Sequence, residues 1–221
     1  MNWWPHLRDF LAGLFAKQRV AETAAQQGTE LETPIATVAV PITATGYSVE
    51  EERAAAVSRL AAAQAEAIAM FPADPIPGPG DQPRHSLVKQ EWRTKCNFGV
   101  QHVAHALYCH DLDGLRADQM VQKLGAGYAP WREDSLERGV EHALRGGLAI
   151  VGWDNPADGK SGHVATIAPR EMALSPSWGV KVPFLANVGT PEAQGIKLMS
   201  ACFRRHQAHA IRCFLWKVGE V

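Results

Sequence analysis

The stretch "TKCNFGVQHVAHAL", residues 94–107, decides how the second half of this 221-residue chain is interpreted. It predicts a helix over 96–109 in which Cys96 stands in the first turn, close behind Thr94, a residue type suited to cap a helix. The first turn of a helix has backbone N–H groups without partners in the helix and a partial positive charge. Both features stabilise a thiolate, so a cysteine at this position is expected to have a lowered pKa and to be a candidate nucleophile.

The pattern of the same helix predicts where the sulfur lies. The positions four, seven and eleven residues after Cys96 are occupied by Val100, Val103 and Leu107, all apolar. Residues at this spacing share one face of a helix. Cys96 is therefore expected at the N-terminal end of the buried face, along the seam between this helix and a sheet.

A thiolate nucleophile needs a base, and His163 in "KSGHVATIA" is the candidate. It begins a predicted strand, directly after the loop "DNPADGKSG". A third group should orient the imidazole, and Asn187 is the polar residue within the apolar run "FLANVG". Asp154 and Asn155, which precede the histidine, are alternatives for that third role. The ordered set of a cysteine on a helix and then His and Asn on successive strands is a stronger indication than any of its members.

The order of elements after residue 88 predicts an α+β fold, with a helix packed on an antiparallel sheet. Helices are expected first, over 96–109, about 116–125 and 134–145, the last capped by Asp134 or Ser135. Apolar, strand-like runs follow at 147–153, 162–168, 182–189 and 210–218.

The N-terminal third has a different composition and is expected to be a separate region. An amphipathic helix is predicted over 5–19 and an extended arm over 32–46. Ser48 and Glu51 have the spacing of a capping box, which predicts a helix over 49–70. Gln64 interrupts the apolar face of that helix. The run "FPADPIPGPGDQP" (71–83), rich in Pro and Gly, predicts a linker. The expected organisation is a docking region at 1–83 followed by a catalytic domain at 84–221.

Composition and charge restrict the classes of partner. The formal net charge is −1, so no excess of basic residues indicates binding to nucleic acid. No apolar run reaches the length of a membrane span. The N-terminus "MNWWPHLRDFLAGLF" does not match a signal peptide, which predicts synthesis in the cytoplasm. Four cysteines are too few for a disulfide scaffold in a chain of this length.

Two groups of residues allow a metal site as an alternative. The first is "CFRRHQAHAIRC", whose potential ligands are Cys202, His206, His209 and Cys213. Its spacing misses the common patterns of structural zinc sites, so packing is the favoured interpretation. The second comprises His102, His105, Cys109 and His110, for which exposed helix histidines are favoured. Neither a metal nor a cofactor is expected to be required.

Four segments together resemble a known family. "KCNFGVQHVAHAL", "GLAIVGW", "GHVATI" and "LANVG" are similar to the papain-like peptidoglycan hydrolases of the CHAP and NlpC-type amidase/peptidase group, and the resemblance covers roughly residues 90–218. It implies Cys96 as nucleophile, His163 as base and Asn187 as orienting residue, with an amide or peptide bond of peptidoglycan as the substrate. The family's usual Gly-Asp before its second strand is absent from "GGLAIVGW".

The resemblance and the N-terminal third together predict a biological setting. Without a signal peptide, such a hydrolase must be released by lysis, injected, or built into a phage particle. The expected setting is a virion- or tail-associated lysin that acts at the cell wall and docks on a larger protein assembly through residues 1–83. The alternatives are a secreted antibacterial effector, a cysteine transferase or protease acting on proteins, and a structural protein that has this fold without using it.

Overall fold

The computed structural model describes residues 48–71, 95–156, 162–189 and 193–217. All of them belong to one compact unit, residues 41–221, whereas the first unit, residues 1–40, falls outside them. The helix expected over 5–19, the arm over 32–46 and the linker from residue 72 onward also lie outside the described residues.

The described chain has an α+β fold built on a six-stranded sheet in which every neighbouring pair is antiparallel. The strand order is β1-β8-β2-β3-β6-β7. The strands are β1 (Trp131–Asp134), β2 (Ala149–Trp153), β3 (His163–Ile167), β6 (Phe184–Asn187), β7 (Gly195–Leu198) and β8 (Arg212–Trp216). A separate hairpin joins β4 (Ala173–Leu174) and β5 (Lys181–Val182). The central strands β2, β3, β6 and β8 fall within the four runs expected from their apolar composition.

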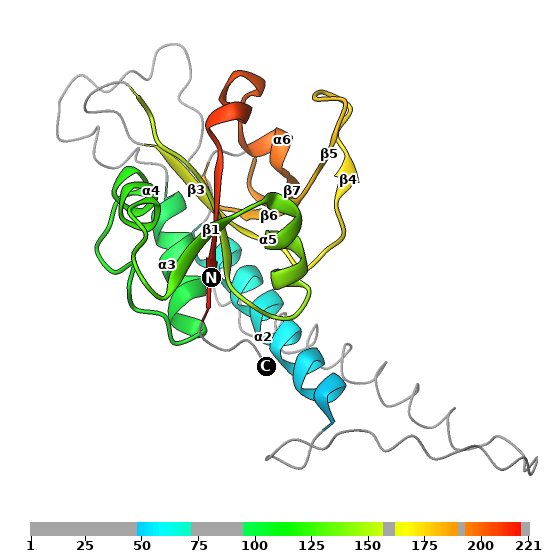
Figure 1. Cartoon of the computed structure of the whole chain (residues 1–221). Helices are drawn as coiled ribbons and strands as arrows, with labels where there is room; N and C mark the ends of the chain where they lie inside the picture. The colour runs from blue at the N-terminus through cyan, green and yellow to red at the C-terminus, as the bar shows by residue number, and fades with distance from the viewer. Residues whose placement is uncertain (1–47, 72–94, 157–161, 190–192, 218–221) are drawn as a thin grey trace, which may run out of the picture. The chain divides into compact units, whose positions relative to one another are not determined.

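The helices are distributed along the chain as Figure 1 shows. They are α2 (Val49–Met70), α3 (Cys96–Ala106), α4 (Ala117–Gly125), α5 (Leu136–Ala143), α6 (Met199–Cys202) and the 3-10 helix η2 (Arg205–Ala210). The expected capping box is present, because Ser48 Oγ accepts from the Glu51 N–H at 3.2 Å and Glu51 Oε2 accepts from the Ser48 N–H at 2.8 Å. Ser135 caps α5 by accepting from the Arg138 N–H.

Helices cover both faces of the sheet. Thr166 contacts α2, and the register of β2 against β3 places Gly152 on the same face. A Cβ atom at Gly152 would lie 2.5 Å from Val121 of α4, so α4 covers that face too. The opposite face of β8 carries Cys213, whose sulfur would lie 2.6 Å from a Cβ atom at Gly139 of α5. The sheet is therefore buried between α2 and α4 on one side and α5 on the other.

Helix α2 is part of this core. Leu60 is completely buried, and Gln64 is only 1% exposed. The Gln64 amide donates to Thr166 Oγ1 at 3.0 Å and to the Ile167 carbonyl at 2.8 Å. Helix α2 also packs along α3, as Figure 1 shows. The polar residue that seemed to interrupt the apolar face is thus the one that bonds the helix to β3.

These contacts change the expected organisation of the chain. The sequence placed residues 49–70 in a docking region separated from the catalytic domain, but α2 packs in the same compact unit as the residues that follow it. The physical reason is that an isolated helix of this kind leaves its apolar face exposed, whereas packing on β3 and α3 buries it. None of the helices in the described ranges is long and apolar enough to cross a membrane.

Candidate active site

Cys96 is the first residue of α3 and is 2% exposed. The residue that flanks the helix start is Lys95, which provides no side-chain cap; Thr94, the expected cap, lies outside the described residues. Val100 and Val103 line the buried face as expected. The helix ends at Ala106 instead of continuing to 109, because Tyr108 adopts a positive φ of 64° that is incompatible with a continuing α-helix.

His163 and Asn187 are brought together at the same end of neighbouring strands. His163 Nε2 lies 2.7 Å from Asn187 Oδ1. The Asn187 side chain is almost fully buried, and its Nδ2 donates to the Ala193 carbonyl at 3.0 Å. Since that bond uses the amide nitrogen, the oxygen faces the imidazole and requires a proton on Nε2. The other ring nitrogen, Nδ1, is then the one left for a thiol.

Cys96 completes the arrangement from the helix side. The side chains of Cys96 and His163 share a hydrogen bond, and His163 is also bonded to Asn187. Burial disfavours the imidazolium, but the hydrogen bond with Cys96, the charge of its thiolate and the bond to Asn187 outweigh burial and raise the pKa of His163. The structure therefore brings together all three residues that the sequence singled out, in the chemical order thiol, imidazole, amide.

A close approach of α3 to the sheet makes this contact possible. A Cβ atom at Gly99 would lie 2.6 Å from Val188 Cγ2, which is shorter than side chains tolerate. Gly99 lies three residues after Cys96 on the helix, and Val188 directly follows Asn187. Glycine at position 99 thus lets the start of α3 pack against the end of β6, where the thiol can reach the imidazole.

Gln194 supports the segment after Asn187, and sequence reasoning missed this role. Its Oε1 accepts from the Gly189 N–H at 3.0 Å. Its Nε2 donates to the Ile68 and Phe71 carbonyls, at 3.0 and 3.1 Å, at the C-terminal end of α2. The loop beside the candidate site is therefore tied to α2, a long-range contact that no local sequence pattern indicates.

Asp154, an alternative for the third role, is engaged elsewhere. Its Oδ2 accepts from the Gln122 amide of α4 at 3.0 Å. The ring of Phe203 instead packs edge-on against His163, with 5.0 Å between ring centroids. Asn187 therefore supplies the polar contact to the imidazole, and Phe203 supplies an apolar one.

The remaining cysteines are in different environments. All four cysteines lie among the described residues, and no disulfide joins any of them. Burial raises the pKa of Cys109 to about 11, of Cys202 to about 12 and of Cys213 to about 12. None of these three thiols would ionise appreciably at neutral pH, whereas Cys96 has an imidazole beside it.

Neither of the two alternative metal sets is assembled among the described residues. Cys213 is buried in β8, while His206 and His209 are exposed on η2. Within the described ranges, the one group of three or more potential ligands that converges consists of His105, His110 and Asp113, all exposed. This group lies at the C-terminal end of α3, whereas Cys96 is at the N-terminal end of that helix.

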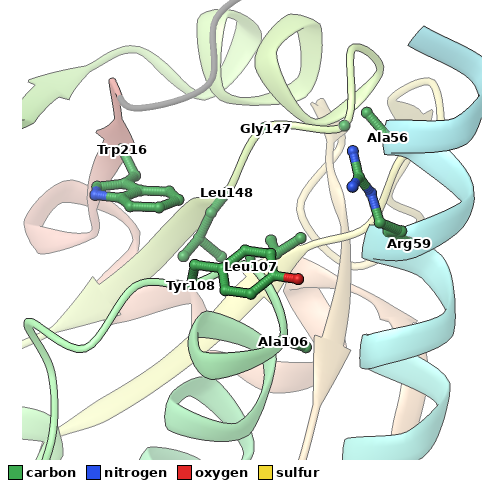
Figure 2. Close-up of a pocket in the computed structure, with 9 residues that line it drawn as sticks. Ala56, Arg59, Ala106, Leu107, Tyr108, Gly147, Leu148 and Trp216 are labelled. Carbon is green, nitrogen blue, oxygen red and sulfur yellow. The ribbon is translucent and has the colours of Figure 1, made fainter. Parts of the chain in front are cut away.

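Described residues line two hollows that are relevant to ligand binding. The first, about 290 Å³, lies at the C-terminal end of α3 and is lined by residues that include Arg59, Leu107, Tyr108 and Trp216. Figure 2 shows the Tyr108 hydroxyl pointing toward the side on which Arg59 lies, and none of the three candidate residues is in this hollow. The second, about 560 Å³, is lined in part by Ala193 and Phe203, which contact Asn187 and His163. The second hollow is therefore the one that adjoins the candidate site.

Comparison with known proteins adds no assignment: no protein-family model matches the chain, and no curated protein matches it significantly.

Proposed function

We propose that this chain is a papain-like cysteine hydrolase that cleaves an amide or peptide bond of peptidoglycan. The observation that supports this most directly is the hydrogen-bonded series Cys96, His163, Asn187, with the cysteine at a helix start and the other two on adjacent strands. The choice of peptidoglycan rests on the resemblance of the segments around these residues to the CHAP and NlpC-type group. The papain-like fold is part of the same proposal.

The proposed chemistry is acyl transfer in two steps. The Cys96 thiolate attacks the carbonyl carbon, a C–S bond forms, and the C–N bond breaks as His163 gives its proton to the leaving amine. Water then attacks the thioester and His163 accepts one of its protons. The C–S bond breaks, which regenerates the thiolate beside the imidazolium and releases a carboxylic acid that loses its proton to solvent. The backbone N–H of Cys96, at the start of α3, is the proposed donor to the oxyanion.

Asn187 has an orienting role in this scheme. By accepting from Nε2–H, it holds the imidazole in the tautomer and rotation that present Nδ1 to the sulfur. The bond from Asn187 to Ala193 fixes the amide itself. We further propose that the residues before α2 dock the enzyme on a virion or tail, with injection as a secreted effector as the alternative setting.

Release of dye from labelled, purified sacculi tests the proposed activity. We expect release by the wild-type chain and a loss of at least about a thousandfold in Cys96→Ser and His163→Gln. Cys109→Ser is a matched control, because Cys109 is equally buried but contacts Asp111 instead of the imidazole. Release by Cys96→Ser at the wild-type rate would show that the fold is present without the proposed chemistry.

A further inference from the structure

The hollow beside the candidate site is rich in positive charge. We call it the Arg204–Arg205 pocket, and its nine lining residues are Ser177, Trp178, Ala193, Ser200, Ala201, Cys202, Phe203, Arg204 and Arg205. None of these residues is acidic, and both arginines are exposed. Within the part of the chain that the structure describes, neither guanidinium forms an ion pair. Two arginines that form no ion pair with any described residue therefore line this hollow.

The backbone of Arg204 is held at the start of η2. Arg204 precedes η2, and its backbone N–H donates to Gln207 Oε1 at 2.7 Å. Arg204 directly follows Phe203, whose ring packs on His163. Burial raises the pKa of the Cys202 thiol, and the nearby Lys197 ammonium acts against that rise, so a third positive charge lies close to the same wall. The positive charges therefore gather on the part of the hollow next to Phe203, the lining residue that contacts His163.

The other lining residues suit a ligand that has both polar groups and an apolar portion. Ser200 Oγ accepts a hydrogen bond from Ser175 Oγ at 2.7 Å, which leaves the Ser200 hydroxyl hydrogen available as a donor. Trp178 adds an aromatic side. Guanidinium groups bind carboxylates through paired N–H donors, and this geometry makes arginine selective for planar anions.

From these contacts we propose that the Arg204–Arg205 pocket binds a free carboxylate of the substrate and holds it next to the catalytic imidazole. This inference rests on the proposed function and names the part of peptidoglycan that would be recognised: a stem peptide with a free carboxylate near the cleaved bond. A stem peptide in which that group is a carboxamide would lose the charge that the two arginines recognise.

Binding of matched peptides tests the proposal without requiring catalysis. The probes are a fluorescent stem peptide with free carboxylates and its carboxamide analogue. Fluorescence anisotropy measures the binding of each peptide to the full-length Cys96→Ser chain. We expect the carboxylate form to bind at least about tenfold more tightly, and added salt to weaken it more than the carboxamide form. Equal binding of the carboxylate and carboxamide peptides, or binding of neither, overturns the proposal.

Variants in the same background assign the effect to the two arginines. Arg204→Gln combined with Arg205→Gln should remove the preference for the carboxylate form, and Arg204→Lys combined with Arg205→Lys should keep part of it. Arg145→Gln is the matched control, because Arg145 is also exposed but does not line the pocket. A circular dichroism spectrum shows whether each variant is folded. A folded double Gln variant that keeps the preference also overturns the proposal.

The binding and hydrolysis results separate the two claims. If the wild-type chain hydrolyses sacculi but the two peptides bind equally, carboxylate binding by the pocket is refuted and the proposed function is not. If the affinities of the two peptides differ as expected but sacculi remain intact with the wild-type chain, the proposed hydrolysis is refuted and carboxylate binding by the pocket is supported.

Discussion

His163 Nε2 and Asn187 Oδ1 lie 2.7 Å apart, and the amide nitrogen of Asn187 is held in turn by the Ala193 carbonyl. The imidazole is thereby fixed from the side opposite to Cys96. Because Asn187 is buried, no water competes for this bond. The relationship makes Asn187 a positioning residue whose contribution to catalysis can be measured separately from that of the thiol.

We expect Asn187→Ala to lower kcat/KM by about tenfold or more, equivalent to about 1.4 kcal/mol of transition-state stabilisation. The loss should be in kcat, because the imidazole would no longer be held toward the sulfur. Asn187→Asp keeps an acceptor for Nε2–H and should retain more activity than Asn187→Ala. Steady-state rates of dye release measure both, and an Asn187→Ala enzyme with wild-type kcat would refute the positioning role.

The four cysteines should differ in their rate of alkylation by iodoacetamide at neutral pH, with Cys96 fastest. Accessibility alone favours Cys202, which is only partly buried, over Cys96, which is 2% exposed. Thiolate content favours Cys96, since the pKa of Cys202 is raised to about 12. Peptide mass spectrometry after brief labelling of the native protein ranks the four. Faster labelling of Cys202 than of Cys96 would remove the argument for an activated thiol.

The raised pKa of His163 should depend on Cys96. Removing the sulfur in Cys96→Ala leaves burial, which disfavours the imidazolium, together with the bond to Asn187, so the pKa of His163 should fall. NMR titration of histidine-labelled protein measures it, with His163→Gln identifying the resonance among the nine histidines. Cys109→Ala is the control. An unchanged pKa in Cys96→Ala would contradict the thiol–imidazole contact.

The same shift has a consequence for stability. In the folded state the pKa of His163 is raised above its ordinary value of 6.5, so the folded protein binds this proton more tightly than the unfolded chain. The resulting stabilisation is fully present below pH 6.5 and is lost as the pH rises through the raised pKa. In Cys96→Ala the folded-state pKa should be lower, so this loss should be smaller and should be complete at lower pH. Chemical denaturation of both proteins across this pH window provides the comparison.

Removal of α2 should destabilise the catalytic unit. Leu60→Ala is expected to lower the free energy of unfolding by about 2–5 kcal/mol, because Leu60 is completely buried. Leu144→Ala is a comparison, because Leu144 is only partly buried at the edge of the core and should cost less. A chain that starts at residue 84 lacks all of α2 and should be unstable, whereas one that starts at residue 41 should fold and keep its activity. A stable, active chain of residues 84–221 would show that α2 is dispensable.

Much of the architecture could be predicted because it is encoded locally. The capping box at Ser48 and Glu51 predicted α2 with the bounds that it has, and apolar runs predicted the four central strands. The order of Cys96, His163 and Asn187 predicted which residues would meet. Each of these features depends on spacing within a short segment or on the type of element that carries the residue.

Other features depend on contacts between distant segments and could not be predicted in this way. Strand β1, "WRED", is mostly polar and is a strand because it pairs with β8 at the edge of the sheet. Gln64 and Gln194 looked like ordinary polar residues, yet both form bonds that span more than a hundred positions. The segment from Cys202 to Cys213 was weighed as a zinc site from its ligand types, whereas the structure packs its Phe203 on the imidazole and places Arg204 and Arg205 around a neighbouring hollow.

The central claim is that Cys96 and His163 hydrolyse an amide bond of peptidoglycan, and mass spectrometry of digested sacculi in oxygen-labelled water tests it most directly. With the wild-type chain, we predict soluble fragments that carry a new amine at one end and a labelled carboxylate at the other, and none with Cys96→Ala. The position of the labelled carboxylate identifies the bond that is cut. Fragments ending at cleaved glycosidic bonds, the same fragments with Cys96→Ala, or intact sacculi with both proteins would contradict the account.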